Sequence, residues 1–259
     1  MANVTITVDG PRATVTLSRP DVRNAFNDDV IAELTTAFQT LGARADVRAI
    51  VLAAEGPAFC AGADLNWMRR MADYSREENL ADARRLAAML RTIHDCPKPT
   101  VARVQGDAYA GGVGLVAVCD IALAVETAGF CLSEVKLGLI PATIGPYVVR
   151  AMGVRAAQRY FLTAERFDAA EARRIGLVHE VVPSDALDAR VDALVRSLCS
   201  AGPCALAAAK RLVHEVAEAP LDDVLVARTV EAIADIRASA EGREGVQAFL
   251  HKRKPQWLV

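Results

Sequence analysis

The chain has few aromatic residues and little excess of either charge. Phe, Trp and Tyr make up 5% of its 259 residues, and the formal net charge is −2. Proteins that bind nucleic acid without sequence preference need a basic surface, and single-strand binders also need aromatic side chains on which bases stack. The composition therefore argues against a nucleic-acid partner, and any anionic ligand has to be met by local cations.

Long apolar runs and paired cysteines are also absent. No uninterrupted apolar stretch reaches the roughly 18 residues that a membrane-spanning helix needs. The N-terminus has neither the charged nor the apolar region of a signal peptide. The six cysteines include no C-x-x-C pair, and a chain of this size needs no disulfide bonds for stability. We therefore expect reduced thiols, no membrane insertion and a cytoplasmic location.

The sequence lacks the motifs of several common enzyme classes. It contains no G-x-S-x-G, no G-x-x-x-x-G-K-[ST] and no H-E-x-x-H. Its histidines, His94, His179, His214 and His251, are scattered, and no Cys or His spacing suits zinc. We expect these histidines to be core or surface residues, and we expect no metal.

The pattern of apolar residues predicts an α/β body followed by helices. Alternation on both sides of residues 9–12 predicts an opening β-hairpin, and helical spacing from Asp28 onward predicts the first helix. Residues 75–78 (Ser-Arg-Glu-Glu) have the form of a capping box at a helix start. Strand-like runs then become rare toward the C-terminus. We expect a mixed body over residues 1–195 and a helical region over residues 196–259, whose apolar faces need a partner surface.

Two loops of small residues form the first part of a candidate site. One loop covers residues 59–64 (Phe-Cys-Ala-Gly-Ala-Asp) and the other covers residues 110–114 (Ala-Gly-Gly-Val-Gly), where Gly111 and Gly112 open a short helix. Amides at a helix start have no partner within the helix and carry its positive end. Each loop can therefore aim a backbone donor at one oxyanion.

Glu134 is the candidate proton carrier. Its neighbours Phe130, Leu132, Val135 and Leu137 are apolar, so we expect a raised pKa, which helps a carboxyl both to accept and to return a proton. An oxyanion site beside such a carboxyl is suited to enolate chemistry on a thioester.

Each of these features has a plainer explanation when taken alone. Glycines before a helix usually serve close packing, and a single Glu after a strand is usually solvated or salt-bridged. Residues 112–117 also match G-x-G-x-x-A, with Glu134 about 20 residues on, as a dinucleotide site requires. Only about seven residues separate Gly112 from Asp120, too few for a full crossover helix. The two loops and the acid together, in this order, favour the oxyanion site.

Nearly end to end, the sequence resembles the enoyl-CoA hydratase/isomerase family, also called the crotonase family. The resemblance rests on residues 19–20, 23–25, 59–65, 106–120, 132–141, 172–178 and 252–255. It implies an α/β fold, a spiral of ββα units with a C-terminal helical trimerisation region, and trimers that often pair into hexamers. Residues 133–153 are similar to members that hydrate branched, carboxylated thioesters such as 3-methylglutaconyl-CoA or related isoprenoid acids, the carboxygeranoyl-CoA branch.

The resemblance also assigns roles to single residues. It makes the amides of Ala63 and Gly111 the oxyanion donors and Glu134 the catalytic carboxylate. The residues that it implies for binding of the acyl-CoA substrate are Val22, Arg23, Ala25, Ala61, Asp64, Leu65, Gly112, Gly114, Phe249 and Lys252. Phe249 and Lys252 are implied to reach the ligand of a neighbouring subunit. Coenzyme A is part of the substrate, so no separate cofactor is implied.

One position departs from the family pattern. Two-carboxylate hydratases of the family carry a first Glu three residues after the oxyanion glycine, and that position is Gly114 here. Glu134 alone must then deprotonate water and deliver a proton to Cα, or move a proton between C2 and C4 of a 3-enoyl thioester. We expect a hydratase acting on a 2-enoyl-CoA. A Δ3,Δ2-enoyl-CoA isomerase and a non-catalytic acyl-CoA-binding protein are the alternatives.

Overall fold

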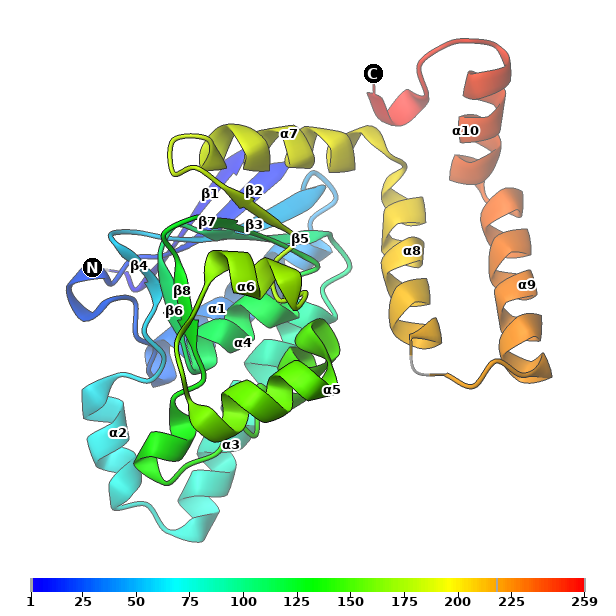
Figure 1. Cartoon of the computed structure of the whole chain (residues 1–259). Coiled ribbons are helices and arrows are strands. Elements are labelled where there is room, and N and C mark those ends of the chain that lie inside the picture. The colour runs from blue at the N-terminus through cyan, green and yellow to red at the C-terminus, as the bar shows by residue number, and fades with distance from the viewer. Residues whose placement is uncertain (1, 218, 259) are drawn as a thin grey trace.

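The strands form two sheets within the body of the molecule (Figure 1). The structure is a computed structural model, and it describes residues 2–217 and 219–258. The six-stranded sheet has the order β1-β2-β3-β5-β7-β10, and the four-stranded sheet has the order β4-β6-β8-β9. The strands are β1 (Val4–Asp9), β2 (Arg12–Leu17), β3 (Ala49–Ala54), β4 (Ala58–Cys60), β5 (Thr100–Val104), β6 (Asp107–Tyr109), β7 (Ile121–Val125), β8 (Gly129–Cys131), β9 (Phe167–Asp168) and β10 (Glu180–Val182).

Helices cover the sheets and continue beyond them. The α-helices are α1 (Asp28–Ala43), α2 (Leu65–Ala72), α3 (Arg76–His94), α4 (Gly111–Val118), α5 (Gly145–Thr163), α6 (Ala169–Arg174), α7 (Leu187–Ser200), α8 (Pro203–Val216), α9 (Asp223–Ala238) and α10 (Ala240–Leu250). The 3₁₀ helices are η1 (Pro20–Val22), η2 (Glu134–Leu137) and η3 (Gln256–Leu258).

The sheets are built from repeated units of two strands and a helix. β3 leads into β4 and α2, β5 leads into β6 and α4, and β7 leads into β8, η2 and α5. In each unit the first strand joins the large sheet and the second joins the small sheet. Neighbouring units pair in parallel, as β3 does with β5 and β5 with β7. This is the ββα arrangement that the resemblance implied, so the α/β fold prediction is confirmed.

Local sequence explains where several elements begin. β1 and β2 form the predicted antiparallel hairpin, with Val4 opposite Leu17. The side chain of Asn27 caps α1 by accepting a hydrogen bond from the amide of Val30. α3 begins with the predicted capping box, in which Ser75 and residue 78, a Glu, bond to each other's backbone amides. The starts of these elements are therefore set by short-range signals.

The C-terminal helices leave the body. α7 packs on the large sheet through Leu187, Val191 and Val195, whereas α8, α9 and α10 stand beside the body, on the side away from α2 (Figure 1). No residue of α8 is buried. The expected division at residue 195 falls within α7, and the helices that stand apart begin at Pro203. The two-part division of the chain stays a prediction.

The helices of the described residues differ in length and in apolar character. No single helix there is both long and apolar enough to cross a bilayer. α7 and α8 are long and apolar enough only when they are taken together, and the two helices are bent by 105° relative to each other.

Asn24 fastens the segment that joins β2 to α1. It has a left-handed backbone conformation, with a φ of 54°, and is 1% exposed. Its Nδ2 donates to the carbonyl oxygens of Glu55 (2.7 Å) and Ala58 (2.8 Å), and its Oδ1 accepts from the amide of Arg19 (2.9 Å). The segment is thereby held against the chain that enters the first small-residue loop.

Replacement of Asn24 is expected to destabilise the fold. Asn24→Ala leaves the Glu55 carbonyl and the Arg19 amide without their partners, and each such loss costs roughly 1–3 kcal/mol. It also puts Ala in a left-handed conformation that Asn tolerates better. We expect the free energy of unfolding in urea to fall by at least about 2 kcal/mol.

The matched control for this change is Asn79→Ala. Asn79 also donates to two carbonyls, those of Tyr74 and Ser75, but on the exposed first turn of α3. Equal losses of stability in the two variants would contradict the structural role of Asn24.

Candidate active site

The three segments of the predicted site follow three neighbouring strands of the small sheet. β4 pairs in parallel with β6, and β6 pairs in parallel with β8. The first small-residue loop follows β4, the second follows β6, and Glu134 comes shortly after β8. Because the carboxyl ends of parallel strands meet at one edge of a sheet, these segments are delivered to the same place.

The two small-residue loops lie against each other, backbone to backbone. A Cβ atom on Gly112 would come within 2.9 Å of the Cβ of Cys60, and a Cβ on Gly62 would lie 3.7 Å from the amide nitrogen of Gly111. Gly62 also has a φ of 87°, which residues with a side chain rarely adopt. Glycine at these positions brings the first turn of α4 next to the loop that carries Ala63.

The next feature of the site is the pair of amides of Ala63 and Gly111. Among the described residues, no oxygen accepts a hydrogen bond from either nitrogen. The amide of the preceding Ala110 is bonded to the Cys131 carbonyl (2.8 Å), which ties the start of α4 to the end of β8. The predicted donor pair is therefore available to an outside acceptor, and its role remains a prediction.

Glu134 opens η2 and carries an unpaired carboxylate oxygen. Its Oε2 is buried and has no hydrogen-bond partner within the described ranges. Burial raises the pKa of the carboxyl above its ordinary value of 4.5, and this effect outweighs a hydrogen bond from its own backbone amide, which lowers the pKa. The predicted raised pKa is confirmed. The predicted apolar cover is only partly right, because Phe130 and Leu132 are buried whereas Leu137 is 60% exposed.

Gly114 has no room for a side chain. A Cβ on Gly114 would lie 2.8 Å from the Cβ of Ile144 and closer still to its Cγ2. Ile144 directly precedes α5 and is 2% exposed, so its neighbours hold it in place. Position 114, where the resemblance implied a first acid in two-carboxylate hydratases, is thus filled from another part of the chain. No local pattern in the sequence points to Ile144, because the two residues are far apart in the chain.

Several residues predicted to bind the acyl-CoA substrate gather beside the first loop. The Ala61 amide donates to the Arg23 carbonyl (2.9 Å), which joins the two segments. Val22, Leu65 and Arg23 are exposed, whereas Ala25 is buried. Exposed apolar side chains beside a guanidinium group suit a ligand that has both apolar and phosphate parts.

Asp64 serves the protein's own structure. Its Oδ1 accepts from the amides of Asn66 and Trp67 at the start of α2, and its Oδ2 accepts from Arg19 (2.9 Å). Desolvation raises the pKa of this carboxyl, but the hydrogen bonds from Arg19 and the two amides outweigh it and lower the pKa below its ordinary value. Both oxygens are engaged within the chain, so a contact with substrate would have to come from the backbone.

Phe249 and Lys252 do not reach the candidate site within one chain. Phe249 is 82% exposed on α10 and Lys252 follows that helix, and α10 lies apart from α2 and α4 (Figure 1). Their predicted contact is with the ligand of a neighbouring subunit, which a single chain does not test.

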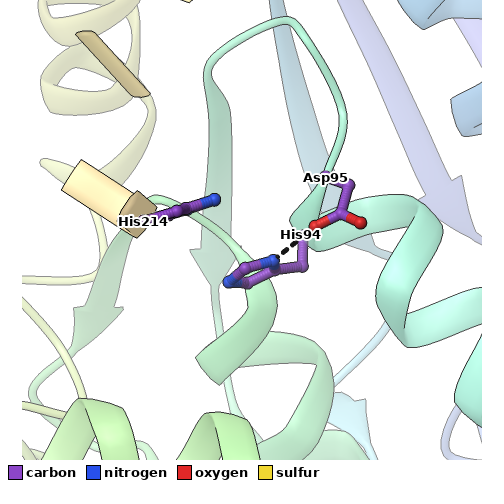
Figure 2. Close-up of side chains that lie close together, drawn as sticks. All are labelled: His94, Asp95 and His214. Carbon is purple, nitrogen blue, oxygen red and sulfur yellow. Dashed lines mark hydrogen bonds and ion pairs between the residues drawn. The ribbon is translucent and has the colours of Figure 1, made fainter. Parts of the chain in front are cut away.

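His94 and His214 meet between the body and α8, although they are scattered in the sequence (Figure 2). Their rings stack with centroids 4.1 Å apart and an interplanar angle of 16°, and Nδ1 of His94 lies 2.8 Å from Oδ1 of Asp95. An imidazole binds a metal ion through the lone pair in the plane of its ring, so stacked rings cannot both direct a nitrogen at one ion between them. This cluster does not have the form of a metal site.

Glu134→Gln is expected to raise the thermal unfolding temperature at neutral pH. A carboxyl whose pKa is raised by folding contributes its full stability below the unfolded value of 4.5, and this contribution is lost as the pH rises through the folded value. The amide does not ionise, so the gain should shrink as the pH is lowered toward 4.5.

Glu171→Gln provides a control of opposite sign. Hydrogen bonds from Arg174 and Tyr160 lower the pKa of Glu171 to about 2, so loss of its charge should lower the unfolding temperature at neutral pH. Melting curves recorded over a range of pH check both signs. A lower unfolding temperature for Glu134→Gln at neutral pH would show that burial does not disfavour its charge.

Comparison with known proteins agrees with this geometry. Residues 12–258 match the family model described as enoyl-CoA hydratase/isomerase. The enoyl-CoA hydratase ACTT6 of Alternaria alternata is 38% identical over 237 residues, which cover 91% of this chain and 77% of that protein. The crystal structure of an enoyl-CoA hydratase from Shewanella pealeana has 45% identity and a TM-score of 0.96, covering 98% of this chain and 96% of the other. Pseudomonas aeruginosa AtuE has 35% identity and a TM-score of 0.95, covering 99% and 100%. The chain belongs to the enoyl-CoA hydratase/isomerase family.

Proposed function

We propose that the protein is an enoyl-CoA hydratase that adds water across the double bond of a 2-enoyl-CoA thioester. The observation that carries the proposal is the buried Oε2 of Glu134, which has no partner among the described residues and lies in the segment after β8. The neighbouring strands β6 and β4 lead to the Gly111 and Ala63 amides at the same edge of the sheet. We extend the proposal to branched or carboxylated acyl groups, because residues 133–153 resemble members that act on such substrates.

In the proposed mechanism the chain supplies two donors and one proton carrier. The amides of Ala63 and Gly111 donate to the thioester oxygen and stabilise the negative charge that develops there as water adds to C3. Glu134 takes a proton from the attacking water while the O–C3 bond forms. It then gives a proton to C2 as the enolate collapses, so that OH and H are added to the same face. The raised pKa of Glu134 suits both transfers.

The alternative activity is that of a Δ3,Δ2-enoyl-CoA isomerase. There Glu134 removes a proton from C2 of a 3-enoyl thioester and delivers it to C4. The filled space at Gly114 favours this alternative, because Glu134 then acts without a second acid at that position. A proton shuttle needs one base, whereas two carboxylates hold an attacking water from both sides. The third possibility is a non-catalytic acyl-CoA-binding protein. Such a protein would have no need of the raised pKa of Glu134.

We also propose that the chain assembles through its C-terminal helices, as trimers or as hexamers of two trimers. Apolar side chains there are widely exposed in the single chain. The largest exposed fractions in these helices and in the connection between α8 and α9 are those of Leu221 (88%), Phe249 (82%), Val224 (68%), Leu250 (64%) and Val213 (61%). Copies of the same chain, packed around a symmetry axis, would remove this surface from water.

A cytoplasmic location is part of the proposal. All six cysteines are free thiols, in keeping with a reducing compartment. Burial raises the pKa of Cys60 to about 12, against a smaller opposite effect of the Gly62 amide, so this thiol stays neutral beside the candidate site.

Glu134→Gln is expected to lower kcat by about 10²–10⁴-fold, because the variant loses the proton carrier but keeps the shape of the site. Binding of the acyl-CoA should survive. Turnover is followed over a panel of CoA esters, as loss of the conjugated thioester absorbance for 2-enoyl esters and as its gain for 3-enoyl esters, with branched and carboxylated members included. Glu126→Gln, on the exposed turn after β7, is the control.

The same panel separates the three functions. Hydration of 2-enoyl esters supports the hydratase. Formation of a conjugated thioester from 3-enoyl esters, without hydration, supports the isomerase. Binding without either reaction supports the acyl-CoA-binding protein, and unchanged turnover in Glu134→Gln would remove Glu134 from the mechanism.

The assembly is tested by a charge on the exposed face of α9. The double variant Val224→Asp with Val230→Asp should sediment as the single 27.6 kDa chain, because burial of two carboxylates at an interface is unfavourable. Val8→Asp, on the outer strand β1, is the control and should leave the assembly intact. An unaltered protein that sediments as a single chain would refute the trimer.

A further inference from the structure

Phe26 bonds to the first small-residue loop through its backbone. Its amide donates to the Gly62 carbonyl (2.9 Å), and its carbonyl accepts from the Asp64 amide (3.0 Å). These two bonds lie on either side of Ala63, and they form an isolated parallel bridge between Phe26 and Ala63. The peptide that carries the Ala63 amide is therefore fixed to Phe26.

The ring of Phe26 ends against the second loop. A Cβ on Gly111 would lie 2.9 Å from Cε1 of this ring and closer still to Cζ, so the tip of the ring fills the place of a side chain on Gly111. Phe26 is 2% exposed, and its ring packs with that of Trp67 on α2, with centroids 6.0 Å apart. The ring cannot withdraw from Gly111 without repacking α2, and Gly111 cannot move toward the ring.

A donor pair is effective only when both nitrogens are held at the spacing that one oxygen requires. A displacement of about 1 Å costs on the order of 10²-fold in rate. Ala63 and Gly111 lie on different loops, and Phe26 spans them by its backbone on one side and its ring on the other. We propose that Phe26 is a positioning residue that sets the distance between the Ala63 and Gly111 amides. This inference rests on the proposed function, in which those amides hold the thioester oxygen.

Phe26→Leu tests the role of the ring. Leu keeps a buried apolar side chain and the backbone bridge to Ala63, but it lacks the ring tip that meets Gly111. We expect kcat to fall by about tenfold or more, with KM changed by less than about twofold. The reason is that a misplaced donor loses more of its stabilisation of the transition state than of its contribution to substrate binding. Phe38→Leu is the matched control, because Phe38 is equally buried but lies on α1 beside Gly42 and Cys96.

A spectroscopic measurement separates positioning from a loss of packing. Glu134→Gln, which does not consume the ligand, is saturated with the CoA thioester of an aryl-conjugated 2-enoic acid. Hydrogen bonds to the thioester oxygen polarise the conjugated system and shift its absorption to longer wavelength. Addition of Phe26→Leu should reduce this shift for the bound ligand by at least half, whereas addition of Phe38→Leu should leave it unchanged.

A second pair of variants tests the contact itself. Gly111→Ala should be severely impaired, because its Cβ overlaps the Phe26 ring. Phe26→Leu combined with Gly111→Ala should be more active than Gly111→Ala alone, since the shorter side chain makes room.

The outcomes distinguish this inference from the proposed function. If Phe26→Leu retains both the full spectral shift and the full kcat, Phe26 does not position the donors, and the proposed function stands. If the protein with Phe26 intact neither turns over the thioester panel nor shifts the absorption of the bound ligand, the proposed function is wrong and the inference falls with it.

Discussion

The parallel pairing of three short strands is the constraint on which the candidate site depends. β4, β6 and β8 each end where a site segment begins, and their pairing fixes the order and spacing of these segments. The loops then come so close that only glycine fits at the points of contact, as at Gly112 against Cys60. Few side chains take part in this arrangement, because backbone amides act as the donors and need no side chain of their own.

The carboxyl groups of Asp64 and Glu134 lie near this edge of the sheet. They are chemically similar, but their surroundings give them different roles. Asp64 is buried, yet Arg19 and two backbone amides keep the pKa of its carboxyl low, so it stays ionised and holds the loop. Glu134 is partly buried, one of its oxygens has no partner within the part of the chain that the structure describes, and desolvation raises its pKa. The first group is saturated with hydrogen bonds and cannot take part in proton transfer, whereas the second has kept the capacity to bind a proton.

The features that sequence predicts well are those whose signals lie within a few residues. The capping box at Ser75, the hairpin and the glycine-led start of α4 are all of this kind. Asp64, directly before α2, caps that helix with its side chain, and its predicted part in substrate binding stays a prediction. The exposed Leu137 departs from the prediction: it is the last residue of η2, before a left-handed Gly138, and it belongs to a run of exposed residues over 136–140.

Contacts between distant parts of the chain were beyond such prediction. The ring of Phe26 against Gly111 and the stacking of His94 on His214 depend on how strands register and how helices return. No spacing rule links these residues, since each pair is brought together only by the completed fold. The same holds for the proposed trimer, because its interfaces would join surfaces of different copies that no spacing within the sequence relates.

The contact between Gly114 and Ile144 limits how this lineage can change. A mutation that introduces an acid at position 114 arrives in a space that is already filled, and a mutation that first trims Ile144 opens a cavity in a buried region. Either mutation alone lowers the stability of the fold. A protein with one acid and Ile144 can therefore reach a form with two acids and a smaller residue at position 144 only through a destabilised intermediate, which selection disfavours. Descendants of this gene are therefore expected to inherit a single acid, and a second one should arise only together with a smaller residue at position 144.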